Sequence, residues 1–171
     1  MPNNKIQSLF SKIKQIPNFP KSGINFFDLN PVFANPADFQ ILIEALAEPL
    51  KNLALDKIIG VESRGFILGA ALAQHLKIGF VPLRKPGKLP PPVIRKSYSL
   101  EYGKDALEIQ PGSGRVALID DVLATGGTLL AAASLSEEAG YQIESIQVVL
   151  NLKDLNSFSW KKQKAQSLFE V

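Results

Sequence analysis

The stretch "VALIDDVLATGGTLLAA", residues 116–132, predicts a strand, a turn and a helix in direct succession. Its first four residues are all apolar, as in a central strand of a parallel sheet that is buried on both faces. Asp120 and Asp121 follow at the carboxyl end of that strand, which is where open α/β sheets bind their ligands. We therefore predict an α/β fold with a ligand site at this edge, followed by a helix over residues 127–139.

The turn from Thr125 to Thr128 has the features of a phosphate cradle. Because a helix begins there, backbone N–H groups and the positive end of the helix dipole face the turn, and Gly126 and Gly127 allow a close approach. No lysine follows the glycines and no GxGxxG pattern is present, which excludes the nucleotide-triphosphate P-loop and the dinucleotide fingerprint. The simpler alternative is that Asp121 caps the turn and the glycines only tighten it.

Two carboxylates beside such a cradle would repel a phosphate unless the ligand also donates hydrogen bonds or carries a cation. The hydroxyl groups of ribose are donors, and Mg²⁺ prefers oxygen ligands. A ribose 5-phosphate therefore suits both the aspartates and the turn that follows them.

Periodicity predicts the elements of the first half of the chain. Apolar residues at helical spacing favour an amphipathic helix over residues 4–15, ended by Pro17, and residues 17–31 form a loop or short extended arm. Asn35 before Pro36 is typical of an N-cap with proline in the first turn of a helix. The βαβ unit that follows consists of a strand, a helix and a strand at residues 57–61, 65–76 and 79–83.

The second half of the chain begins with a basic, proline-rich segment. Residues 85–96 contain four prolines and a glycine, which favours an irregular loop. Residues 97–102 and 105–109 predict two short strands that could pair as a hairpin. A further strand is expected over residues 143–152, and residues 153–171 show weak patterning beyond a short helix and a final strand.

The composition excludes several classes of protein. The net charge of +3 over 171 residues is too small to indicate nucleic-acid binding. Without cysteine there are no disulfides, thiolate metal sites or cysteine nucleophiles, and the single histidine, His75, argues against a Ser-His or multi-histidine zinc site. No stretch reaches the roughly 18 apolar residues of a membrane span. We expect a cytoplasmic enzyme or binding protein with no nucleic-acid or membrane partner.

"VALIDDVLATGGT" resembles the phosphoribosyl pyrophosphate (PRPP) motif of type I phosphoribosyltransferases. Four further segments, in order and at suitable spacing, are similar to landmarks of the adenine phosphoribosyltransferases within that family: "FPKSGINFFDLNP", "GVESRGFILGAALA", "VPLRKPGKLP" and "YSLEYGKDALEI". The resemblance implies transfer of 5-phosphoribose from PRPP to adenine, giving AMP and pyrophosphate in purine salvage. It also implies Mg²⁺ as cofactor and a homodimer.

The same resemblance implies a fold and a domain organisation. The expected fold is a central, mostly parallel sheet flanked by helices, with a small hood and a flexible loop or hairpin flap. The chain would form a single domain over residues 1–171. Its parts would be an N-terminal helix and hood over about 1–34, a core over about 35–152 and a C-terminal tail over 153–171.

By resemblance, the PRPP site divides between sugar and pyrophosphate. Asp120 and Asp121 would bind the ribose hydroxyls. The 5-phosphate would be wrapped by Ala124, Thr125, Gly126, Gly127 and Thr128. The pyrophosphate would be bound by the loop of Glu62, Ser63 and Arg64, and by a mobile basic lid with Arg84, Lys85 and Lys88. Loops of the first kind often hold a cis peptide.

The resemblance also assigns the reacting groups. Arg64, Lys88 and Glu101 are the catalytic candidates, with Glu101 as a general acid or base near the purine. Mg²⁺ would be held mainly by PRPP, and no direct protein ligand is assigned to it. Without the PRPP motif, the basic loop would be taken as a solvated surface loop.

The adenine site is implied to include Ile24, Phe26 and Phe27. Backbone groups near Ile24 would read the base, and the ring of Phe26 would stack on it. Phe27 stands where the family usually has arginine or lysine, so a preference for another purine, hypoxanthine or guanine, stays an alternative. A PRPP-sensing regulator is a second alternative, against which Arg64, the lid cations and Glu101 argue.

Overall fold

The computed structural model describes residues 2–100 and 103–171. The chain divides into two compact units, residues 1–45 and residues 46–171. No described helix is both long and apolar enough to cross a membrane.

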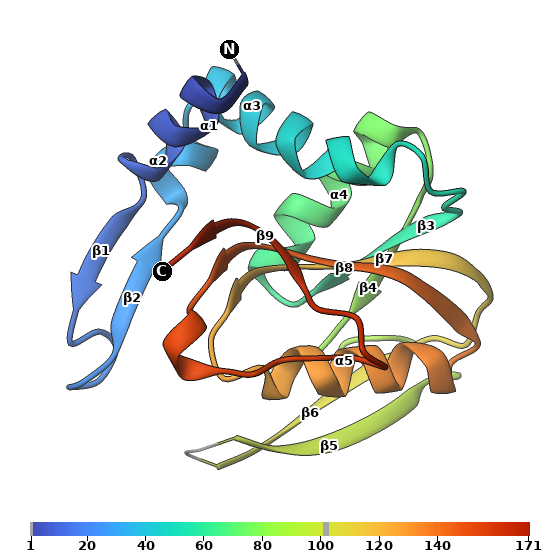
Figure 1. Ribbon diagram of the computed structural model, residues 1–171. Helices are drawn as coiled ribbons and strands as arrows, with labels where there is room; N and C mark the ends of the chain where they lie inside the picture. Colours follow the sequence, from blue (N-terminus) through green and yellow to red (C-terminus); the bar gives the residue numbers. More distant parts are fainter. Residues whose placement is uncertain (1, 101–102) are drawn as a thin grey trace. The chain divides into compact units, whose positions relative to one another are not determined.

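The second unit is built on a five-stranded, fully parallel sheet (Figure 1), as predicted. Two helices, α4 (Arg64–Leu76) and α5 (Gly127–Glu138), cover its opposite faces. The strand order is β4-β3-β7-β8-β9. The strands span Lys57–Val61 (β3), Gly79–Leu83 (β4), Gly114–Leu123 (β7), Tyr141–Asn151 (β8) and Gln166–Glu170 (β9).

The strand order places a crevice between β3 and β7. From β3 the chain crosses through α4 to β4 on one side, and from β7 it crosses through α5 to β8 on the other. Because such crossovers are right-handed, the two helices fall on opposite faces and diverge at the carboxyl ends of β3 and β7. Ligands of open α/β sheets bind at this kind of switch point.

The apolar pattern of the central strands explains the core of this unit. In β7, Val116, Ala117, Leu118 and Ile119 are all buried, which matches a strand covered on both faces. The strand continues through both aspartates to Leu123, two residues beyond Asp121. The aspartates therefore lie in the part of β7 that still pairs with β8, and not in a loop.

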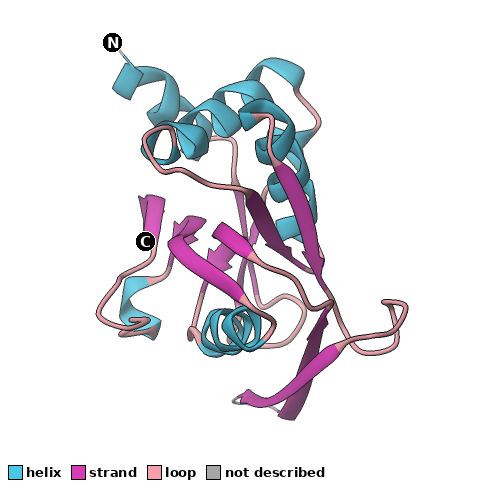
Figure 2. Cartoon of the chain, turned by 90° about the vertical axis from the view of Figure 1, so that its right-hand side faces the viewer, coloured by secondary structure: helices cyan, strands magenta, loops and turns pink. Residues whose placement is uncertain are grey.

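A separate hairpin packs on α5. Strands β5 (Ile94–Leu100) and β6 (Gly103–Ile109) pair antiparallel, which confirms the predicted hairpin. Figure 2 shows α5 nearly end-on between the sheet and this hairpin. Because β5 begins at Ile94, the last residues of the predicted loop 85–96 belong to a strand instead.

The C-terminal residues complete the sheet. The short helix and final strand expected in residues 153–171 correspond to a 3-10 turn (η2, Lys153–Leu155) and to β9, which pairs in parallel with β8. Another 3-10 turn (η1, Glu48–Leu50) precedes β3.

The first unit differs from the sequence prediction near its start. Helix α1 (Pro2–Phe10) ends five residues before the predicted end of the helix 4–15, which was wrong beyond Phe10. Strand β1 (Lys14–Pro17) pairs antiparallel with β2 (Asn25–Asp28). Ile16 continues the helical spacing, but its pairing with Phe26 in β2 decides its conformation. The predicted extended arm is therefore one half of a hairpin.

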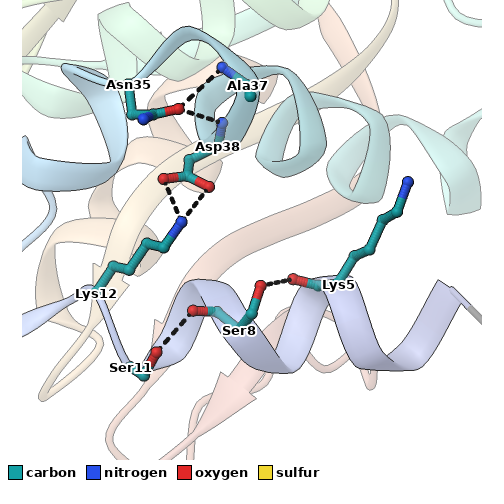
Figure 3. A network of polar contacts seen from close by, with 7 residues as sticks. All are labelled: Lys5, Ser8, Ser11, Lys12, Asn35, Ala37 and Asp38. Carbon is teal, nitrogen blue, oxygen red and sulfur yellow. Dashed lines mark hydrogen bonds and ion pairs between the residues drawn. The ribbon is translucent and has the colours of Figure 1, made fainter.

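Helix α3 (Pro36–Ala47) begins as predicted, after the small helix α2 (Asn30–Phe33). The Asn35 side-chain oxygen accepts hydrogen bonds from the N–H groups of Ala37 and Asp38, both at 3.1 Å. Asp38 is buried and binds Lys12 Nζ through both oxygens, at 2.6 and 2.7 Å (Figure 3). This pair fixes the segment after α1 to the first turn of α3.

Candidate active site

The switch point of the sheet brings together two site segments that were predicted from the sequence. After β3, the Glu62–Ser63 peptide bond is cis, as the resemblance implied, and α4 begins at Arg64. Nε of Arg64 lies 2.7 Å from Oδ2 of Asp121 in β7. The pyrophosphate-loop candidate and the ribose candidate are therefore in direct contact.

A glycine allows this close approach. A Cβ atom on Gly65 would lie 2.8 Å from the carbonyl oxygen of Ile119 and 3.3 Å from Oδ1 of Asp120. The start of α4 thus rests directly on the backbone of β7 at the first aspartate. Any larger side chain at this position would push the helix, and Arg64 with it, away from the strand.

The two aspartates are held in different environments. Asp121 is only 6% exposed and pairs with Arg64. Its backbone N–H donates to Oδ1 of Asp120 at 2.9 Å. Burial of the Asp120 carboxyl, and secondly the neighbouring charge of Asp121, raise the pKa of Asp120 well above its usual range. Hydrogen-bond donors or a cation supplied by a ligand would stabilise the charged form of this pair.

The turn before α5 forms a small pocket beside the aspartates. Gly126 is the N-cap with a φ of +88°, a conformation that glycine adopts without strain. The pocket has a volume of about 90 Å³. Its lining residues are Asp120, Val122, Leu123, Ala124, Thr125, Gly126, Thr128 and Leu129. A phosphate in it would meet the N-terminal end of a three-turn helix.

Residues 84–93, which we call the basic loop, are fixed to the loop after β3 by Glu62. The Glu62 carboxylate accepts hydrogen bonds from Arg84 Nε at 3.2 Å and from the Lys85 N–H at 2.9 Å. Burial alone would raise the pKa of Glu62, but these hydrogen bonds outweigh burial and lower it. The Arg84 guanidinium also lies over the ring of Phe66, 5.6 Å from its centre. Arg84 is therefore held beside the start of α4.

The candidate adenine residues all lie in the first unit. Ile24 ends the loop between β1 and β2, and Phe26 and Phe27 are successive residues of β2. Successive side chains of a strand point to opposite faces. Phe27 is 6% exposed, whereas Phe26 is partly exposed and meets Phe19 edge-on at 5.2 Å. The two rings thus face different surroundings.

The third catalytic candidate, Glu101, lies outside the described residues. Strand β5, which precedes it in the sequence, is hydrogen-bonded to α5. Lys96 Nζ donates to Ser134 Oγ at 2.7 Å, and the hydroxyls of Tyr98 and Thr128 are 3.5 Å apart. The β5–β6 hairpin therefore contacts the helix that begins at the turn of residues 124–128.

Comparison with known proteins identifies this arrangement. The model of the phosphoribosyl transferase domain matches residues 30–163. An adenine phosphoribosyltransferase from Synechococcus is 51% identical over 150 residues, which are 84% of this chain and 85% of that protein. The chain belongs to the adenine phosphoribosyltransferase family.

Solved structures of adenine phosphoribosyltransferases share the fold. The enzyme from Thermoanaerobacter pseudethanolicus is 42% identical with a TM-score of 0.89, covering 97% of this chain and 99% of that one. The Saccharomyces cerevisiae enzyme, 40% identical with a TM-score of 0.86 over 96% and 97% of the two chains, was solved with an imino-altritol bisphosphate and adenine. The expected type I phosphoribosyltransferase fold is confirmed.

The donor set suits a Mg²⁺ ion only when the substrate contributes ligands. Among the residues that the structure describes, no three His, Asp or Glu side chains gather in one place. Asp120 and Asp121 offer carboxylate oxygens, and Mg²⁺ is commonly bound through one or two carboxylates plus substrate phosphates. The residues present therefore fit a magnesium complex of an adenine phosphoribosyltransferase substrate, with Asp120 and Asp121 as the nearest protein donors.

Two residues near the site were not predicted from the sequence. Phe158 lies under the phosphate turn, where a Cβ on Gly126 would approach its ring to 3.3 Å. Glu108 in β6 is completely buried and bonds the basic loop. The only sequence signal for Glu108 was an acidic residue between Leu107 and Ile109. This pattern is equally typical of a strand in which the acidic side chain faces solvent, so it did not indicate a buried carboxylate.

Proposed function

We propose that this chain catalyses transfer of 5-phosphoribose from PRPP to adenine, giving AMP and pyrophosphate in purine salvage. The observation that carries the proposal is the contact between Arg64 and Asp121. It joins a pyrophosphate-type loop to a ribose-type carboxylate at the switch point, next to a phosphate-sized turn. The family membership of the chain supports the same reaction.

In this proposal each part of PRPP has its own protein partners. Ribose hydroxyls donate to Asp120 and Asp121, which are acceptors when ionised. The 5-phosphate lies in the turn at residues 124–128, against the N-terminus of α5. The ribose therefore lies between the two carboxylates and the turn, and its 5-phosphate does not contact the carboxylates.

The leaving pyrophosphate is the part that needs positive charge. As the bond to the anomeric carbon breaks, negative charge grows on the pyrophosphate and positive charge on the sugar. Arg64 at the start of α4, together with Arg84, Lys85 and Lys88, would neutralise the leaving group. Glu62 contributes through its backbone and by holding Arg84. A basic loop closed over the site would also exclude water, which would otherwise hydrolyse PRPP.

Magnesium is proposed to enter with PRPP. When bound with PRPP, the ion would supply charge neutralisation for the leaving group. Asp120 and Asp121 are the protein groups that would hold it. The raised pKa of Asp120 fits this role, because a cation would favour the ionised form of the carboxyl.

The base is proposed to be selected by the β1–β2 hairpin. The ring of Phe26 would stack on adenine, and backbone groups near Ile24 would pair with its edge. Glu101 would exchange a proton with the base or balance its charge. The buried ring of Phe27 would support the hairpin rather than contact the base, because it faces away from Phe26.

The deciding experiment is a base-specificity assay. Initial rates are measured with adenine, hypoxanthine and guanine at fixed PRPP and Mg²⁺, and pyrophosphate release is recorded in parallel. Adenine should give the highest rate. A faster reaction with hypoxanthine or guanine would assign another purine, and PRPP binding without pyrophosphate release would assign a PRPP-sensing protein.

We further propose that the enzyme is a cytoplasmic homodimer. The family resemblance supports this assembly, because the basic lid of family members can reach a partner's site. Light scattering coupled to size-exclusion chromatography should give twice the chain mass of 18.6 kDa. A monomer at assay concentrations with full activity would contradict the proposal.

A further inference from the structure

The basic loop encloses an internal anion. Oε1 of Glu108 accepts hydrogen bonds from the N–H groups of Lys88 and Leu89, at 2.8 and 2.9 Å. The N–H group of Gly87 also contributes, and Gly87 has a φ of +78°. Successive N–H groups around such a residue form a concave nest that binds anions. Here the nest is filled by a fully buried carboxylate of the same chain.

Glu108 also fixes both ends of the cationic segment. Its backbone N–H donates to the Arg84 carbonyl at 2.7 Å, and the Arg84 N–H donates to the Glu108 carbonyl at 2.9 Å. The backbone of Arg84 is held by these two bonds and that of Lys88 by the carboxylate. Two of the three basic-loop cations proposed to bind pyrophosphate, Arg84 and Lys88, are therefore positioned by one residue.

The same carboxylate ties the loop to the hairpin. Arg95 in β5 lies directly opposite Glu108 in the antiparallel register, and its Nη2 donates to Oε2 at 3.1 Å. The hairpin, the end of β4 and the basic loop thus meet at Glu108.

The loop needs such an anchor for two reasons. Pro86, Pro90, Pro91 and Pro92 have no N–H groups, so the loop can form few backbone hydrogen bonds of its own. Its cations, three within five residues, also repel one another. A buried carboxylate surrounded by donors supplies the missing bonds and offsets the repulsion.

The ionisation of Glu108 is consistent with a permanent anchor. Burial alone would raise the pKa of Glu108. The hydrogen bonds from Gly87, Leu89 and Lys88 N–H groups and from Arg95 outweigh burial and lower the pKa to about 2. The carboxylate is therefore charged throughout the neutral range.

We propose that Glu108 is a positioning residue that holds the cations of the basic loop in the arrangement that binds the pyrophosphate group of PRPP. It acts through Arg84 and Lys88 and is not proposed to touch substrate. The inference rests on the pyrophosphate role proposed above for these cations.

The test is Glu108→Gln, which keeps the shape of the side chain but replaces one acceptor oxygen with a donor that opposes the surrounding donors. The KM for PRPP and the inhibition constant of pyrophosphate should each rise about tenfold. The KM for adenine should stay within about twofold. Amide exchange of the peptide covering residues 84–93 should become faster than in the native enzyme.

Glu144→Gln is the matched control. Like Glu108, Glu144 is a carboxylate paired with an arginine, Arg115 at 3.0 Å, but it is only partly buried, lies on β8 and has no described contact with the basic loop. It should lose comparable stability without a change in the KM for PRPP. If both variants alter this KM equally, or if Glu108→Gln leaves it and the loop exchange unchanged, the positioning role is wrong.

Glu108→Asp covers the case in which the glutamine variant does not fold. It keeps the charge but withdraws the carboxylate by one methylene, so the KM for PRPP should rise by a smaller factor, about threefold. An unchanged KM in a folded Glu108→Asp enzyme would also overturn the proposal.

Arg84→Ala and Lys88→Ala separate this inference from the proposed function. Both should raise the KM for PRPP and the inhibition constant of pyrophosphate. If they do so while Glu108→Gln does not, only the positioning role fails. If neither alanine variant affects these constants, the pyrophosphate role of the basic loop itself fails.

Discussion

Arg64 and Asp121, which are 57 positions apart in the sequence, form an ion pair with Nε 2.7 Å from Oδ2. The pair closes the switch point of the sheet, because Arg64 begins α4 and Asp121 lies near the end of β7. It also restrains the guanidinium and the carboxylate that the proposed reaction uses for the pyrophosphate group and the ribose hydroxyls of PRPP.

Replacing both aspartates should abolish PRPP binding. In Asp120→Asn with Asp121→Asn, two charged acceptors for ribose hydroxyls and the partner of Arg64 are lost together. We expect the dissociation constant of PRPP to rise about 100-fold or more, with the fold intact. Isothermal titration with PRPP and Mg²⁺ measures this, and circular dichroism checks the fold.

Asp154→Asn is the control for charge alone, because Asp154 is exposed in the turn before β9. It should bind PRPP like the native enzyme. Native affinity in the double variant would mean that the aspartates do not bind ribose.

Gly65→Ala should damage the site more than the fold. The added methyl group would lie 2.8 Å from the Ile119 carbonyl oxygen, so the start of α4 must move away from β7. We expect a loss of about 1–3 kcal/mol in the free energy of unfolding and a raised KM for PRPP. Denaturant unfolding and steady-state kinetics measure the two effects.

Gly69→Ala provides a matched clash on the same helix. Its methyl group would lie 2.8 Å from the ring of Phe80, one turn further from the site. A similar loss of stability with a native KM for PRPP is expected. Equal KM changes in the two variants would show that the contact at Gly65 has no special effect on the site.

Phe26 and Phe27 should give opposite phenotypes when changed to alanine. Phe26→Ala removes the proposed stacking partner, so the KM for adenine should rise roughly tenfold while stability changes little. Phe27→Ala empties a buried position and should lower the free energy of unfolding by about 3–5 kcal/mol. An unchanged KM for adenine in Phe26→Ala would remove its ring from the base site.

Acid should destabilise the native enzyme partly through Glu108. Its folded-state pKa of about 2 lies below the ordinary value of 4.5. Its contribution is therefore complete above about pH 4.5 and is lost as the pH falls towards 2. Glu62 is shifted in the same direction.

The free energy of unfolding, measured by urea titration across this pH window, should fall less steeply in Glu108→Gln than in the native enzyme. Glu44→Gln, at an exposed position of α3, serves as control and should keep the native slope. Parallel pH profiles for all three proteins would contradict a stabilising role of the ionised carboxylate.

Most of the second unit was predictable because local signals agree with the sheet. The apolar run of β7 predicts a buried strand and the glycine turn at Gly126 predicts the start of a helix, and the structure has both elements there. In the first unit, Asn35 likewise caps α3 as its sequence context predicts. The cis peptide at Glu62–Ser63 followed only from the resemblance, because no local pattern encodes it.

The features that were not predicted from the sequence depend on contacts between segments that are apart in the chain. Lys14–Pro17 continues a helical pattern but becomes a strand because β2 pairs with it. Glu108 looks like one polar position in a short strand, and only the fold brings the Lys88 and Leu89 N–H groups onto it. Arg64 and Asp121 were each predicted, but their ion pair required the strand order.

The pairing of β9 with β8 bears on solubility. β8 is buried from Ser145 to Leu150, and β9 pairs with its C-terminal part, Gln147–Asn151. If the chain were shortened before residue 166, β8 would become an exposed sheet edge, which is a template for aggregation. The short strand with Gln166 and Glu170 exposed at its ends therefore protects the protein against association through its own sheet.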